Sequence, residues 1–100
     1  MLSPDDKLAL NEKDVVFTEL DDTGVLLNLR SKYYYTTNET GLRIIELVKR
    51  GHSGAEIVEH ILAEFDIDRA TCKEHVLGMI AELDREGLAQ RVRPPVQPTA

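Results

Sequence analysis

A chain of 100 residues is long enough for one domain with a small core, because a domain of this size buries only about 60 to 65% of its unfolded surface. That size excludes a large buried substrate chamber, while 42% hydrophobic and 30% charged residues are ordinary for a globular protein. No apolar run approaches the roughly 20 residues of a membrane span, and residues 1–10 lack the apolar core of a signal peptide. The one cysteine, Cys72, cannot form an internal disulfide, so we expect a cytoplasmic protein with no membrane partner.

The net charge of −6 is concentrated near the start of the chain. Residues 1–22 hold seven acidic residues and two lysines, whereas residues 23–90 hold eleven acidic and eight basic residues. Nucleic-acid binding normally leaves a concentrated basic patch, and this sequence has none. We therefore expect no nucleic-acid partner.

Three strands are predicted after a flexible N-terminal segment, residues 1–13, which is polar and mixed in charge. Residues 15–20 and 25–29 are apolar and flank the turn-forming run at residues 21–24. A third strand covers residues 33–37, where Tyr and Thr are strong strand formers. The short connections predict an antiparallel meander.

Two helices follow the strands. The first begins after Asn38, a good N-cap, and ends before Gly51. The second, residues 54–65, begins with a capping box formed by Ser53 and Glu56. Both carry apolar residues at helical spacing, which indicates one face packed on the sheet.

A third helix is capped by Asp68 and stopped by Gly87, after which Leu88 folds back on the last turn. Its apolar stripe repeats at steps of three and four residues and consists of Cys72, Val76, Met79, Ile80 and Leu83.

The element order predicts an α+β domain at residues 14–90, of winged helix-turn-helix type, with a three-stranded antiparallel sheet followed by three helices. Residues 91–100 contain Pro94, Pro95 and Pro98, which cannot continue a helix. They predict a disordered tail.

Catalytic motifs are missing from the sequence: there is no Gly-rich phosphate loop, no HExxH, no nucleophile elbow and no paired-cysteine motif. Cys72, His75 and His60 form a conceivable metal trio, but Cys72 lies on the apolar stripe and a fourth ligand is lacking. We therefore expect no metal, no cofactor and no enzymatic activity.

The tyrosine strand is the strongest functional signal. Side chains alternate along a strand, so Tyr33 and Tyr35 point one way and Tyr34 the other, and the sequence leaves open which side is buried. At a sheet edge this strand would offer unpaired backbone groups to an incoming peptide. Leu77 widens the apolar arc of the third helix, either as an ordinary core or dimer contact or as part of a groove beside the tyrosine strand. In that groove Val76, Leu77 and Ile80 form the predicted apolar wall, with Lys73 on the rim.

Seven segments of the chain form one distributed pattern: Leu26-Leu27-Asn28-Leu29, Tyr33-Tyr34-Tyr35, Thr37-Asn38-Glu39-Thr40-Gly41, Ala55-Glu56-Ile57-Val58, Leu62-Ala63-Glu64-Phe65, Ile80-Ala81-Glu82-Leu83 and Glu86-Gly87-Leu88. Over residues 14–89 this pattern closely resembles the coenzyme PQQ synthesis protein D family.

That resemblance implies a non-catalytic adaptor, which binds the leader of a ribosomally made precursor peptide as an added strand between the third strand and the third helix. It implies presentation of the leader to a maturation enzyme, such as a radical S-adenosylmethionine protein or a leader peptidase, in a PQQ, lasso-peptide or related pathway. Contacts carried over by position are Tyr33, Tyr34, Tyr35, Thr36, Lys73, Val76, Leu77 and Ile80.

The alternative is a winged-helix DNA-binding transcription regulator, which also combines strands with three helices. A recognition helix offers several basic or amide side chains to DNA. The predicted third helix instead has Arg69 and Lys73 near its start, followed by Glu74, Glu82, Asp84 and Glu86. We therefore rank DNA binding second.

Overall fold

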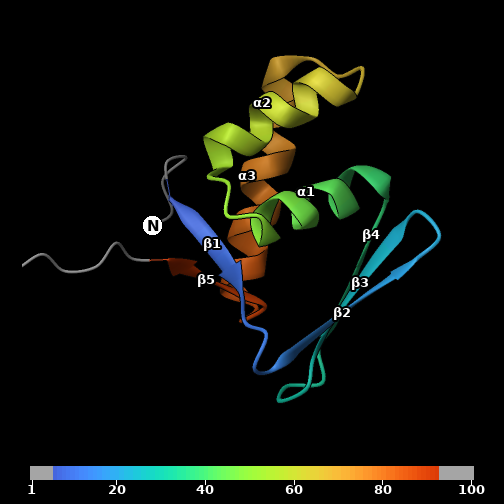
Figure 1. Cartoon of the computed structure of the whole chain (residues 1–100), viewed down its shortest axis with the longest axis vertical. Coiled ribbons are helices and arrows are strands. Elements are labelled where there is room, and N and C mark those ends of the chain that lie inside the picture. The colour runs from blue at the N-terminus through green and yellow to red at the C-terminus, as the bar shows by residue number, and fades with distance from the viewer. Residues whose placement is uncertain (1–5, 93–100) are drawn as a thin grey trace, which may run out of the picture.

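The computed structural model describes residues 6–92 and has two small sheets around three helices (Figure 1). The elements in chain order are β1 (Lys7–Leu10), β2 (Val15–Leu20), β3 (Thr23–Asn28), β4 (Tyr34–Thr37), α1 (Glu39–Lys49), α2 (Gly54–Glu64), α3 (Arg69–Arg85) and β5 (Ala89–Val92). The α+β class and the three-stranded antiparallel sheet followed by three helices are confirmed. No helix of the described residues is long and apolar enough to cross a membrane.

The sheet has the order β2-β3-β4, with antiparallel pairing throughout. Its inner face packs on the core through Val15 and Leu26, with Phe17 half-buried beside them. The predicted turn between the first two strands is tighter than residues 21–24, because β3 already begins at Thr23. Asp21 takes the positive φ of 55° that this tight turn needs.

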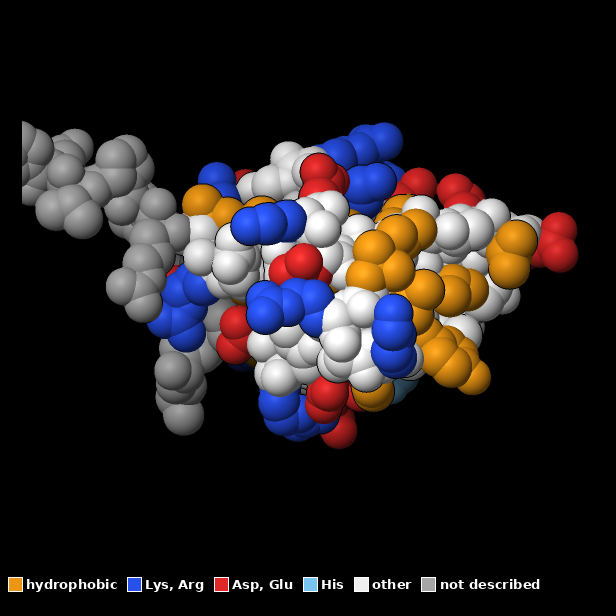
Figure 2. Space-filling model, turned by 90° about the horizontal axis from the view of Figure 1, so that it is seen from below, with side chains coloured by type: hydrophobic (Ala, Val, Ile, Leu, Met, Phe, Trp, Pro, Cys, Tyr) orange, Lys and Arg blue, Asp and Glu red, His pale blue; other side chains and the backbone are white. Residues whose placement is uncertain are grey.

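The outer face of the sheet carries several exposed apolar side chains. Val16 pairs with Leu27, and Leu27 pairs with Tyr34, so these three side chains form a row across all three strands. Leu20 and Leu29 add to the exposed apolar area. Figure 2 shows hydrophobic side chains gathered on the right-hand side of the view, which is the side of the sheet in Figure 1.

The predicted caps of the helices are confirmed. Asn38 Oδ1 accepts a hydrogen bond from the Gly41 N–H at 2.9 Å and begins α1. Ser53 and Glu56 form both hydrogen bonds of the capping box, so α2 begins at Gly54. Each cap gives a partner to backbone N–H groups that the helix itself cannot satisfy.

Helix α3 also ends as predicted. Asp68 Oδ2 accepts from the Thr71 N–H at 3.0 Å, and Gly87 adopts a φ of 71° just beyond the last turn. The Leu88 N–H then donates to the Leu83 carbonyl at 2.9 Å, and both leucine side chains are completely buried. This closure directs the chain into β5.

The prediction of a flexible segment at residues 1–13 is wrong for Lys7–Leu10, which form β1 and pair antiparallel with β5. Leu8 and Leu10 are buried in the core, although four residues of mixed polarity carry little strand signal on their own. Arg91 and Val92, assigned to the tail, belong to β5, whereas Pro94, Pro95 and Pro98 lie outside the described residues. The pairing joins strands about 80 residues apart in sequence and leaves no local pattern to predict it.

Strand β1 is therefore expected to matter for stability. Leu8 is only 2% exposed, so Leu8→Ala removes a buried side chain and leaves a cavity, lowering the unfolding free energy by about 2 to 4 kcal/mol. Urea denaturation measures this loss. The control Glu12→Ala changes an exposed residue of the following turn and should stay within about 0.5 kcal/mol. Equal stability of Leu8→Ala and the natural chain would mean that β1 does not pack as described.

Candidate functional site

Strand β4 is an edge strand of the three-stranded sheet. Among the described residues it pairs only with β3, from Tyr34 opposite Leu27 to Thr37 opposite Gly24. The other side of β4 has no strand beside it and faces the region of α3. An unpaired strand edge of this kind is a template for a further strand.

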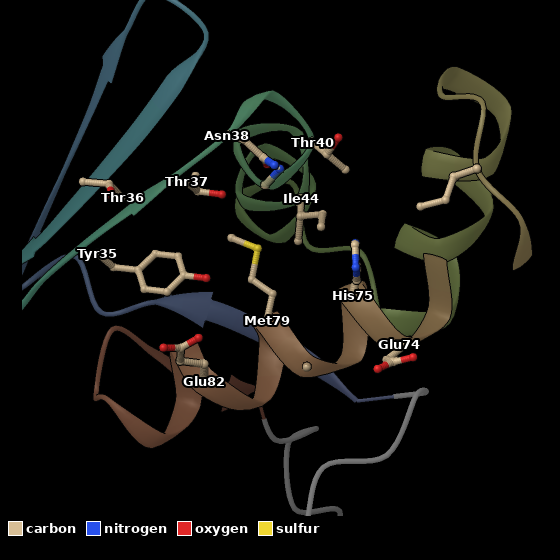
Figure 3. A pocket seen from close by; sticks show the side chains of 13 residues that line it. Tyr35, Thr36, Thr37, Asn38, Thr40, Ile44, Glu74, His75, Met79 and Glu82 are labelled. Atoms are coloured by element: carbon tan, nitrogen blue, oxygen red, sulfur yellow. The ribbon is translucent and has the colours of Figure 1, made fainter. Parts of the chain in front are cut away.

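A groove of about 670 Å³ lies along this edge (Figure 3). Strand β4 and the start of α1 form one wall, and α3 forms the other. The lining comprises Tyr35, Thr36, Thr37, Asn38, Thr40 and Gly41 on the first wall, Glu74, His75, Gly78, Met79 and Glu82 on the second, and Ile44 and Ile67 between them. It therefore combines an apolar centre with polar margins, as peptide grooves commonly do.

The first wall is positioned by the close approach of α1 to β4. Gly41 is buried, and a Cβ added there would overlap the side chain of Thr37. Glycine therefore lets the first turn of α1 pack directly on the end of β4. The Asn38 cap fixes the same junction, so Thr37, Asn38 and Thr40 have defined places in the groove.

The structure answers which tyrosines are buried. Tyr33 and Tyr35 are half-buried and pack against the core, whereas Tyr34 is 65% exposed on the outer face. Tyr33 lies just before β4, so the predicted strand begins one residue too early. Only Tyr35 and Thr36 of the predicted strand contacts line the groove.

Glu82 links the two inward tyrosines to α3. Burial raises the pKa of Tyr35 above its ordinary value of 10.0, and the nearby Glu82 carboxylate raises it further. The pKa of Tyr33 is raised by the same two causes, in the same order. Both hydroxyls therefore remain protonated at neutral pH, and Glu82 lies close to them at one end of the groove.

The predicted helical residues do not line the groove of about 670 Å³. Val76 is completely buried and Ile80 is 5% exposed, so both belong to the core. Lys73 and Leu77 line a different hollow of about 210 Å³, between α2 and α3, together with Ala55, Val58, Glu59 and Arg69. These four predicted helix residues are thus placed away from the groove, and peptide contact by them remains a prediction.

Five helix residues of the groove were missed: Glu74, His75, Gly78, Met79 and Glu82. Met79 was assigned only to the apolar stripe. A signal was present in the spacing of Glu74, Gly78 and Glu82, because residues four apart share one side of a helix. This side of the helix is turned away from the apolar stripe, and the sequence does not say which part of it faces the sheet.

The conceivable metal trio is not assembled. The Cys72 thiol is buried, donates to the Val58 carbonyl at 3.6 Å, and has its pKa raised mainly by burial. His60 lies 4.6 Å from His52 between ring centroids, whereas His75 lines the groove. Within residues 6–92, no group of three or more His, Cys, Asp or Glu side chains is arranged to hold a metal ion.

Comparison with known proteins supports one family. The sequence model for coenzyme PQQ synthesis protein D matches residues 23–89, which include β3, β4, all three helices and the whole groove lining. A comparison with curated proteins found no match.

Two solved structures are similar to this chain over most of its length. TbiB1 in complex with the TbiA(beta) leader peptide is 29% identical, has a TM-score of 0.75, and covers 86% of this chain and 99% of its own. Lasso peptide synthetase B1 complexed with the leader peptide is 24% identical, has a TM-score of 0.73, and covers 83% of this chain and 96% of its own. At 24% identity the second likeness supports the fold alone.

The coupling between Glu82 and the inward tyrosines can be measured. Glu82→Gln removes the negative charge that disfavours ionisation of Tyr33 and Tyr35, so the pKa of both should fall. Ultraviolet titration of the tyrosines follows this change. Asp84→Asn, which removes an exposed carboxylate two residues away, is the control and should leave the titration unchanged. The same curve for Glu82→Gln and the natural chain would contradict the placement of Glu82.

Proposed function

We propose a peptide-binding function for this chain, which belongs to the coenzyme PQQ synthesis protein D family. The chain binds the leader segment of a ribosomally made precursor peptide as an additional strand on β4. The observation that carries this proposal is the open edge of β4 beside a groove of about 670 Å³. The likeness to TbiB1, described in complex with a leader peptide, supports it.

Backbone pairing alone is too weak for this function. Addition of a strand forms about three to five backbone hydrogen bonds, each worth a net 0.5 to 1.5 kcal/mol or so. A micromolar complex needs about 8 kcal/mol after the cost of association. Apolar side chains of the guest must supply the rest, and Ile44, Ile67 and Met79 of the groove lining provide a surface for them.

The guest would face α3 with every second side chain and expose the others on the outer face of the sheet. There they would extend the apolar row of Val16, Leu27 and Tyr34 by one strand.

We propose that the chain acts in the cytoplasm as a non-catalytic adaptor, which holds the leader while a maturation enzyme acts on the rest of the precursor. A radical S-adenosylmethionine protein or a leader peptidase, in a PQQ, lasso-peptide or related pathway, fits this role.

The charges of α3 argue against DNA as the ligand. Its groove side presents Glu74 and Glu82, and no Lys or Arg lines the groove among the described residues. The phosphate backbone of DNA would face these negative charges on α3, the helix that a winged-helix protein inserts into DNA.

Gly78 offers a way to block the groove without harming the fold. An added Cβ at Gly78 meets no atom within 4 Å, so Gly78→Leu can fold, yet its side chain would occupy the middle of the groove. Peptides selected on the natural chain from a displayed library of short random sequences should bind Gly78→Leu at least tenfold more weakly. Isothermal titration calorimetry measures the affinity.

The matched control is Ala81→Leu, which places the same side chain at an exposed position of α3 outside the groove and should leave binding unchanged. Leu77→Asp separates the groove from the wall predicted by the sequence. Because Leu77 lies in the hollow beside α2, this variant should bind normally, and weaker binding would support the predicted contact by Leu77. Bound peptides should protect β4 amides from hydrogen exchange. Selection of no peptide, or equal binding by Gly78→Leu, would refute strand addition in this groove.

A further inference from the structure

The two ends of the groove each carry a carboxylate from α3. Glu82 lies across from Tyr35 at the beginning of β4, and Glu74 lies on the outer side of α3 toward the other end of the groove, where α1 begins (Figure 3). Strand β4 and α3 thus run along the groove in opposite chain directions. A guest strand beside β4 would pass both carboxylates.

These carboxylates are not neutralised by cations of the described chain. No Lys or Arg among residues 6–92 lines the groove, and the salt bridges of these residues include neither Glu74 nor Glu82. Three arginines of the helices pair with other carboxylates: Arg43 with Glu46 and Glu64, Arg69 with Glu59, and Arg85 with Glu86. Glu82 lies close to the Tyr33 and Tyr35 hydroxyls, but a carboxylate has about four acceptor sites and keeps capacity for a guest.

The separation of the carboxylates matches a strand repeat. Eight residues of helix separate Glu74 from Glu82, which corresponds to about 12 Å at 1.5 Å per residue. Four residues of a strand span about 13 Å, and residues i, i+2 and i+4 point to the same side. Guest residues i and i+4 would therefore reach the two carboxylates together.

The residue between them meets a different surface. Gly78 stands halfway between Glu74 and Glu82 on α3 and leaves open space, and Met79 follows it, with Ile44 of α1 across from Met79 (Figure 3). Guest residue i+2 would enter this part of the groove, where an apolar side chain fits.

We propose that the groove selects a leader segment with the pattern basic, any, apolar, any, basic. The two basic side chains pair with Glu82 and Glu74, and the apolar side chain enters the groove at Gly78. The pattern reads the same in both directions, so it holds for a parallel or an antiparallel guest. It rests on the proposed function and adds to it the chemical class of the peptide.

Selection from a displayed library of short random peptides tests the pattern. On the natural chain, Lys or Arg should be enriched at two positions four apart, with an apolar residue midway. A synthetic peptide of the enriched sequence should bind about two- to fivefold more weakly to Glu74→Gln and to Glu82→Gln. The two carboxylates are far apart, so the double variant should lose about four- to twentyfivefold.

The matched control is the double variant Asp22→Asn, Asp84→Asn, which removes the same charge at exposed positions outside the groove and should bind normally. A rescue experiment separates charge pairing from structural damage. Glu74→Lys should prefer a peptide with Glu at one terminal position of the pattern over the same peptide with Lys. Glu74 is exposed and makes none of the described contacts, so this variant can fold even where Glu82 variants are impaired.

The possible failures are distinguishable. In one outcome, Gly78→Leu abolishes binding of the selected peptides, but these peptides show no preference for basic residues. That outcome would overturn the pattern and leave the proposed function standing. The same conclusion follows if both Gln variants bind normally. If no peptide is enriched, or if Gly78→Leu binds as well as the natural chain, the proposed function fails and the pattern with it.

Discussion

The burial of one stripe of α3 determines the chemistry of the candidate site. Cys72, Val76, Ile80 and Leu83 are all within 5% of complete burial, and this packing sets the rotation of the helix about its axis. Each residue turns an α-helix by about 100°, so burial of this stripe leaves Gly78 and Glu82 in the groove beside β4 and Glu74 on its outer rim. The same rotation carries Lys73 and Leu77 toward α2.

The arrangement of the two sheets explains why the edge of β4 is available. Pairing of β1 with β5 covers the far side of the helices and buries Leu8 and Leu10. The three-stranded sheet is fixed separately, through the inner residues Val15 and Leu26. Since β4 needs no further strand for its own burial, its second edge stays unpaired within residues 6–92 and can receive the proposed guest strand.

Local signals made most of the helices and strands predictable. Asn38, Ser53 and Asp68 begin the three helices because each side chain satisfies backbone N–H groups a few residues away. Gly51 and Gly87 follow the ends of α1 and α3 with positive φ, which glycine adopts without strain. These interactions span at most four residues, and so they can be recognised without knowledge of the fold.

The sequence by itself therefore determined the α+β order of elements, the caps, and an aromatic strand suited to receive a peptide. Tertiary structure alone decided that β1 joins β5, that Tyr33 and Tyr35 face inward while Tyr34 faces out, and that Glu74 and Glu82 line the groove. The physical reason is the range of the interactions. Caps and turns depend on neighbours in sequence, whereas strand pairing and helix rotation depend on which surfaces far apart in the chain are buried against each other.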